Sequence, residues 1–235
     1  MQLFITNEFE VRGNNLIVKE KRIFNQLRKV LRARPGYKFA IQPLVYPKKE
    51  FVITRYFLVF ENFDDWFINA KIEKIEQVSF NPVLNGVATA ILNKIDKMEF
   101  IVQKLTEFWV ENIIFWPSKR SVVKQISENK LKRLNKIMLE AAEQSWNLFV
   151  PNLITLKNLE EIFNIWFSNY FLADFGGQKL NCKIEWKSNI FIVGPEGGFE
   201  DDEKNFLYNK CKVVSLWTNI LRAETASVVC GWLLV

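Results

Sequence analysis

The feature that most constrains the fold is an alternation of short apolar runs with longer, helix-like segments in the second two thirds of the chain. The runs "VATAIL", "NIIFWP", "NYFLAD", "NIFIVG" and "KVVSLW" are predicted strands. The segments between and after them are predicted helices: "DKMEFIVQKLTEFWV", "LKRLNKIMLEAAEQS", "LEEIFNIWF", "EDDEKNFLYNK" and "ETASVVCGWLL". Strands that alternate with helices are typical of a mainly parallel sheet. We therefore predict an α/β domain over residues 79–235.

The first 78 residues have a different texture. Apolar stretches such as "QLFI", "NLIV" and "FVITRYFLVF" alternate with period two and are separated by Pro, Gly and Asn. This pattern predicts a small antiparallel barrel over residues 1–78, with "RIFNQLRKVLRA" as its one helical piece.

Positive charge is concentrated in that N-terminal segment. The 235-residue chain has a net charge of +6, and between Lys21 and Lys49 there are nine Lys and Arg residues and no acidic one. Such a cluster indicates a phosphate-binding surface. A solvated charged face would carry the same composition, so charge does not decide between the two.

Several kinds of chemistry are excluded by composition. The chain has no histidine, which removes Ser-His-Asp and Cys-His catalysis and most transition-metal sites. The three cysteines are widely separated, so neither a disulfide framework nor a zinc site is expected; they are Cys182, Cys211 and Cys230. No apolar run approaches the roughly 18 residues that a membrane span requires, and the N-terminus does not resemble a signal peptide. We expect a cytoplasmic protein that binds no metal.

Three segments that follow predicted strands form the candidate site, namely "LADFGG", "GPEGGF" and "WTNILRAETA". Ligands of open α/β sheets bind at the carboxyl ends of strands. Gly194, Gly197 and Gly198 would let the backbone approach a ligand, and Pro195 would fix the turn. The stretch matches neither the Walker A loop nor the dinucleotide-binding fingerprint. It could also be a turn that merely connects two elements.

Charged residues around these segments limit the ligand. The acidic residues 200–203 suit the start of a helix but would repel a phosphate there, which favours a neutral or cationic ligand. Arg222 and Glu224 stand at the start of the last predicted helix. They are either solvated charges of a first helical turn or groups that face a substrate.

Several of these motifs together resemble a known family. "VGPEGGF" and "ILRAETA", preceded in order by "DKMEFIVQK", "SKRSVVK" and "AAEQS", are similar to the RsmE family of 16S ribosomal RNA uridine-N3 methyltransferases. The likeness covers roughly residues 84–232, and "KVLRARPG" extends it toward the N-terminus.

The resemblance implies a SPOUT-type domain tied in a trefoil knot, an N-terminal PUA/OB-like barrel, S-adenosylmethionine as methyl donor, 16S rRNA of the small ribosomal subunit as substrate, and a homodimer. It implies Arg222 and Glu224 as catalytic residues. The implied cofactor-binding residues are Leu172, Gly194, Pro195, Glu196, Gly197, Gly198, Leu216, Trp217, Ile220 and Leu221. The implied RNA-binding residues are Arg28, Arg32, Arg34, Ser118 and Arg120.

The chain departs from the family pattern at tryptophans. Trp109, Trp146 and Trp217 stand where the pattern carries glycine, with Trp66 as a candidate fourth, and the chain has only 9 glycines beside 8 tryptophans. One hypothesis is that the organism reads UGA codons as glycine, which ordinary UGG codons at these positions would rule out. The alternative is that the tryptophans are genuine and pack as core aromatics.

Two other functions are compatible with the same residues. A catalytically silent RNA-binding protein would keep the basic N-terminal segment and have a blocked cofactor pocket. A methyltransferase of the same fold could also act on a different rRNA position.

Overall fold

The computed structural model describes residues 1–47, 50–180 and 187–235 and forms two compact units. The N-terminal unit contains residues 1–45, 50–81 and 143–149, and the C-terminal unit contains most of the remainder. The segment 143–149 thus joins the N-terminal unit although it is distant in sequence. Cys182 and two lysines of the basic cluster, Lys48 and Lys49, lie outside the described residues.

The N-terminal unit is built on a six-stranded sheet with the order β1-β4-β5-β6-β3-β2. Four strand pairings are antiparallel, as expected, whereas β1 runs parallel to β4. The strands are β1 (Gln2–Ile5), β2 (Phe9–Arg12), β3 (Asn15–Val18), β4 (Lys38–Gln42), β5 (Phe51–Asp64) and β6 (Phe67–Phe80).

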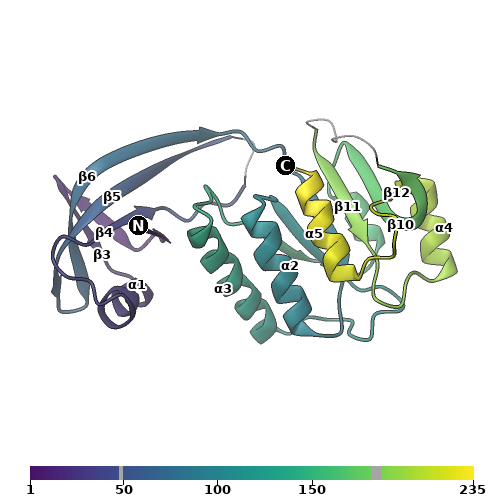
Figure 1. Ribbon diagram of the computed structural model, residues 1–235, viewed down its shortest axis with the longest axis horizontal. Coiled ribbons are helices and arrows are strands. Elements are labelled where there is room, and N and C mark those ends of the chain that lie inside the picture. Colours follow the sequence, from purple (N-terminus) through teal and green to yellow (C-terminus); the bar gives the residue numbers. More distant parts are fainter. Residues whose placement is uncertain (48–49, 181–186) are drawn as a thin grey trace. The chain divides into compact units, whose positions relative to one another are not determined.

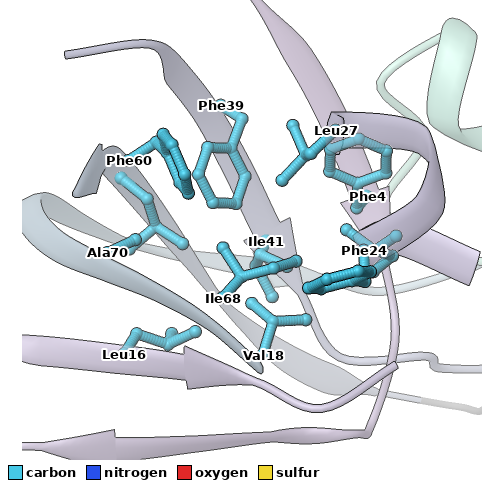
Figure 2. Packing of buried hydrophobic residues seen from close by; sticks show 12 residues of the cluster. Phe4, Leu16, Val18, Phe24, Leu27, Phe39, Ile41, Phe60, Ile68 and Ala70 are labelled. Atoms are coloured by element: carbon cyan, nitrogen blue, oxygen red, sulfur yellow. The ribbon is translucent and has the colours of Figure 1, made fainter. Parts of the chain in front are cut away.

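The predicted helical piece covers the apolar face of this sheet. It consists of α1 (Lys21–Asn25) and a π-helical turn, η1 (Gln26–Val30). Its apolar residues recur at helical spacing, so Phe24 and Leu27 both point into the cluster that Figure 2 shows. Phe4, Phe39 and other fully buried strand residues complete that core. The basic residues Lys21, Arg28 and Lys29 of the same piece are exposed.

The C-terminal unit contains a second six-stranded sheet, with the order β12-β10-β11-β7-β8-β9 and all five pairings parallel. This confirms the predicted α/β domain with a parallel sheet. The strands are β7 (Gly86–Ala90), β8 (Asn112–Trp116), β9 (Asn152–Thr155), β10 (Asn169–Lys179), β11 (Asn189–Val193) and β12 (Lys212–Ser215).

Helices cover this sheet as the sequence pattern predicts. They are α2 (Ile95–Glu107), α3 (Glu128–Gln144), α4 (Asp201–Lys210) and α5 (Ala223–Leu233). Helices α2 and α5 lie side by side and pack against each other, while α4 contacts β10 (Figure 1). On α2 the residues Met98, Ile101, Val102 and Leu105 are buried on one face, which is the spacing that made this helix predictable.

Three local predictions differ from the structure. The expected loop "LADFGG" lies inside β10, where the pairing with β12 shifts register between Ala173 and Gln178. The segment "LEEIFNIWF" forms only a short 3-10 helix, η2 (Glu160–Asn164), because its aromatic and β-branched residues are weak helix formers. Strand β9 is an addition to the strands that the sequence pattern predicts.

Two of the unexpected tryptophans have a backbone conformation that glycine favours. Trp109 has a φ of 62° and Trp146 a φ of 56°. Trp109 follows α2, where its N–H bonds to the carbonyl of Thr106 and the N–H of Val110 bonds to that of Leu105. This is the Schellman helix ending, in which the left-handed position is usually glycine. The geometry supports the hypothesis that 109 and 146 are natural glycine positions.

Trp109→Gly is therefore expected to stabilise the protein. A residue other than glycine costs about 1–2 kcal/mol when its backbone is in the left-handed region. After the lost contacts of the Trp109 ring are subtracted, the free energy of unfolding should rise by about 1 kcal/mol. Denaturant unfolding would measure it. Trp166→Gly is the matched control, since Trp166 is exposed and has no positive φ, and no gain is expected there. A loss of stability in Trp109→Gly would contradict the prediction.

Candidate active site

A cavity of about 540 Å³ opens at the carboxyl ends of β11, of β12 and of the part of β10 that pairs with β11, which ends at Ala173. Its walls come mainly from the three segments that the sequence singled out, together with the last residues of β11 and β12, Leu216 and one residue of α4. The lining residues are Ala173, Asp174, Phe175, Val193, Gly194, Pro195, Glu196, Gly198, Phe199, Lys204, Ser215, Leu216, Trp217, Asn219, Ile220, Leu221, Arg222, Ala223 and Ala226. The place of this cavity follows from the parallel sheet, because carboxyl ends of parallel strands share one edge.

The glycine-rich segment forms one wall through a tight turn. The N–H of Gly198 bonds to the carbonyl of Pro195, and Gly198 has a φ of 72°, which glycine adopts without strain. A Cβ on Gly194 would come within 2.8 Å of the ring of Phe199. Glycine at 194 thus lets the backbone lie directly on that ring.

The segment between β12 and α5 forms the opposite wall. Leu216, Trp217, Ile220 and Leu221 all line the cavity, with Trp217 61% and Ile220 80% exposed. Arg222 is the residue that precedes the first turn of α5, and its exposed side chain also lines the cavity. This wall therefore presents an apolar surface with one cation at its edge.

An ion pair that sequence reasoning missed contributes to the wall. The ammonium of Lys204 lies 3.1 Å from the carboxylate of Asp174, and the hydroxyl of Tyr208 donates to the same carboxylate at 2.7 Å. The Asp174 carboxylate raises the pKa of Lys204. No sequence motif indicates that Asp174 pairs with Lys204. Asp174 lies in β10 at the place where the pairing with β12 shifts register.

The loop that follows β8 fastens the glycine-rich segment from outside. The Arg120 guanidinium bonds to the carbonyl of Gly197 at 3.1 Å and to the Glu200 carboxylate at 2.8 Å. The Ser118 hydroxyl and the Lys119 N–H both donate to the buried Glu203 carboxylate, at 3.0 and 2.8 Å. These contacts hold the first turn of α4, and with it the glycine-rich turn, in one position.

Comparisons with known proteins agree with this geometry. The sequence profile of an RNA methyltransferase domain matches residues 81–234. Ribosomal RNA small subunit methyltransferase E 2 of Borreliella burgdorferi is 30% identical and aligns with 97% of this chain and 94% of its own length. The chain belongs to this methyltransferase E family. The corresponding protein of Mesomycoplasma hyopneumoniae is 31% identical over 67% of this chain and 73% of its own.

Solved structures show the same fold over the whole chain. Methyltransferase E of Neisseria gonorrhoeae, bound to S-adenosyl methionine, superimposes with a TM-score of 0.78 at 24% identity and covers 98% of this chain and 95% of its own. A Legionella pneumophila protein in complex with the cofactor SAM gives 0.83 at 21% identity, over 99% and 96%.

In this member of the methyltransferase E family, most of the expected cofactor residues line one cavity, but two do not. Leu172 is fully buried in the core beneath the cavity. Gly197 faces Arg120 rather than the cavity. Of the two expected catalytic residues, Arg222 lines the cavity, whereas Glu224 lies in the first turn of α5 with its carboxylate 3.6 Å from the ammonium of Lys97.

The expected RNA-binding residues of this family member fall into two groups. Arg28, Arg32 and Arg34 are exposed in the N-terminal unit, and Arg32 has a φ of 49°. Ser118 is fully buried on Glu203, and Arg120 is exposed but engaged by Glu200. The structure thus gives Ser118 and Arg120 contacts that hold the cavity wall.

Metal ligands and membrane spans are both lacking among the described residues. No group of three or more His, Cys, Asp or Glu residues that could hold a metal occurs in the part of the chain that the structure describes. Within the same ranges, no helix is both long enough and apolar enough to cross a bilayer.

Proposed function

We propose that the protein uses S-adenosylmethionine to methylate N3 of a specific uridine in 16S rRNA of the small ribosomal subunit, and that it works in the cytoplasm, where its substrate is made. The observation that carries the proposal is the cavity at the carboxyl ends of β10, β11 and β12, formed by the segments that resemble the family's motifs. The protein's membership in the methyltransferase E family supports the reaction class.

The residues of the cavity fit this cofactor. Its volume lies in the range of roughly 300–1,000 Å³ that is usual for ligand pockets. The walls offer apolar side chains for an adenosine, and the carboxylates of Asp174 and Glu196 in them are each paired with a lysine. The described lining residues include no run of N–H groups with a following Lys that would suit a polyphosphate. When bound, S-adenosylmethionine supplies an activated methyl group, so the protein has to align its acceptor.

Two charged residues are proposed to act on the uracil. Arg222, at the edge of the cavity, is placed to stabilise negative charge on a base whose N3 proton is leaving. Glu224 lies two residues further on, in the first turn of α5, and is proposed either to orient the base or to receive that proton.

The remaining parts of the proposal concern RNA binding and assembly. The N-terminal unit is proposed to be a PUA/OB-like barrel that contacts rRNA through Arg28, Arg32 and Arg34, with Arg120 as a further contact. The C-terminal unit is proposed to be SPOUT-type, with a trefoil knot and a homodimeric arrangement. The parallel strand order, in which β10 lies between β12 and β11, supports the SPOUT assignment.

The decisive experiment combines calorimetric titration of S-adenosylmethionine with methylation of small ribosomal subunits and mapping of the modified nucleotide. Cofactor binding and a single N3-methyluridine in 16S rRNA are expected. A different modified position would support a methyltransferase with another target. Tight RNA binding without cofactor binding would favour the hypothesis of a silent RNA-binding protein. Trp217 in the cavity wall is the reason for testing this alternative. Trp217→Gly is the variant that shows whether this side chain obstructs the cofactor.

RNA affinity is expected to fall steeply with salt. If Arg28, Arg32 and Arg34 each contact one phosphate, replacing all three by alanine should reduce the slope of log affinity against log salt concentration by about 2. Fluorescence anisotropy over a salt series would measure it. A matched triple replacement on α3 should leave the slope unchanged; its positions are Lys132, Arg133 and Lys136. Equal reductions in both variants would contradict an RNA surface on the N-terminal unit.

A further inference from the structure

Lys97 in the first turn of α2 connects two acidic side chains from separate walls of the site. Its ammonium lies 3.0 Å from the carboxylate of Glu196, which belongs to the glycine-rich segment and lines the cavity. The same ammonium lies 3.6 Å from the carboxylate of Glu224 on α5. The packing of α2 against α5 makes this bridge possible.

The surroundings of Glu224 distinguish this contact from an ordinary surface ion pair. The side chain of Glu224 is only 14% exposed, and its Oε2 atom is buried without a hydrogen-bond partner among the described residues. That same atom is the one closest to Lys97. A buried carboxylate without a cation is strongly disfavoured, so this ammonium is the interaction that compensates its charge.

The charged groups near Glu224 that the described residues provide come from three segments. Lys97 faces it from α2, Glu196 shares that lysine from the glycine-rich segment, and Arg222 precedes it on its own helix. Strands β7 and β11, which also pack against α5, carry no charged side chain. Without Lys97, the two carboxylates that now share a cation would repel each other.

We propose that Lys97 is a positioning residue, which holds Glu196 and Glu224 together across the site and so fixes the place of the Glu224 carboxylate. This inference rests on the proposed function, because it says how Glu224 is held for that reaction. The raised pKa of Lys97, caused mainly by its hydrogen bond to Glu196, agrees with a lysine that stays charged between two acids. This role gives a reason for the lysine at position 97 of the "DKMEFIVQK" segment, beside the apolar residues that face the core.

The test compares three variants. Lys97→Met removes the charge and keeps the length, and Lys97→Arg keeps the charge. Lys104→Met removes a lysine of the same helix that pairs with its neighbour Glu107. Single-turnover methylation would be measured at saturating cofactor. Lys97→Met should slow the reaction by up to about 100-fold, because Glu196 and Glu224 lose the cation that holds them in place.

A second readout does not depend on activity. With ¹³C-labelled glutamate, and with Glu224→Gln and Glu196→Gln for assignment, the carboxyl resonances of both residues can be compared between variants at one pH in the protein alone. In Lys97→Met both resonances should move from their wild-type positions, because both carboxylates lose the ammonium that lies beside them. Lys97→Arg should restore both readouts toward wild type, and Lys104→Met should change neither.

The outcomes separate the two hypotheses. If Lys97→Met matches Lys104→Met in the two carboxyl resonances, the inference about Lys97 is wrong whatever the activity. If the resonances move but the wild-type protein methylates no uridine, the bridge made by Lys97 stands and the proposed function fails. Moved resonances with an unchanged methylation rate would overturn the positioning role.

Discussion

Arg222→Ala is expected to slow single-turnover methylation by about 10²- to 10³-fold, the usual effect of removing a group that stabilises charge in a transition state. Arg222 lines the edge of the cavity, and we propose that it faces a base that carries negative charge as it loses its N3 proton. Since its contribution appears only when that charge develops, the affinity for S-adenosylmethionine should change little. Rapid-quench assays at saturating cofactor, with calorimetric titration beside them, would measure both quantities.

Two controls accompany this prediction. Arg222→Lys keeps the charge but not the planar guanidinium and should recover part of the rate. Arg133→Ala removes an exposed arginine of the same unit, on α3, and should leave the rate unchanged. If Arg222→Ala methylated at near the wild-type rate, Arg222 would not stabilise the developing charge. If it lost cofactor affinity instead, Arg222 would belong to the cofactor site.

Arg22→Met is expected to lower the free energy of unfolding of the N-terminal unit by about 3–5 kcal/mol, because it leaves a buried carboxylate without its cation. Glu143 is 3% exposed. Its two carboxylate oxygens accept hydrogen bonds from the Arg22 guanidinium at 2.8 and 3.0 Å, and the N–H of Ile5 donates to one of them at 2.9 Å. The pair joins residue 143 to the N-terminal strands.

The pH dependence of this loss has a definite sign. Burial raises the pKa of Glu143 above its usual value, and the Arg22 guanidinium opposes that rise. A carboxyl whose pKa is raised in the folded state contributes stability below its unfolded pKa and loses it as the pH rises through the folded value. Without Arg22 nothing opposes the rise in the pKa of Glu143. The loss in the free energy of unfolding of Arg22→Met should therefore be largest at neutral pH and should shrink toward pH 4–5. Chemical denaturation at several pH values would measure it.

The controls for Arg22 lie in the same unit. Arg12→Met removes an exposed ion pair with Glu10 and should produce no measurable change. The double variant Arg22→Met with Glu143→Met should recover much of the loss, because replacing both members of a buried pair by apolar groups is often neutral. An equal, small effect of Arg22→Met and Arg12→Met would show that Glu143 is hydrated in solution.

The candidate site is predictable from sequence to the extent that it depends on chain order. The strands before Gly194 and Leu216 carry strong apolar patterns, and in a parallel sheet their carboxyl ends must meet at one edge. The order of the segments therefore places the glycine-rich turn and Arg222 at the same edge of the sheet, while the strand order decides how near they lie to each other. The tryptophans at 109 and 146 likewise stand out in the sequence, but their positive φ angles are a structural finding.

Other residues could not be placed because their roles depend on contacts between distant segments. Nothing near Asp174 in sequence indicates that it pairs with Lys204 from α4. Ser118, expected at an RNA surface, is instead buried on Glu203, because the loop after β8 folds over the start of α4.

By itself the sequence determined the alternation of strands and helices, the segments that line the cavity and the concentration of positive charge in the first 49 residues, since each depends on local pattern and composition. Only the tertiary structure decided the strand order of the parallel sheet, the burial of Glu143 in the N-terminal unit and the bridge of Lys97 between Glu196 and Glu224. The physical reason is that a charged side chain is solvated or compensated according to what packs around it. The partners of Lys97 and Glu143 described above are all more than 90 positions away in the chain, so local sequence does not reveal them.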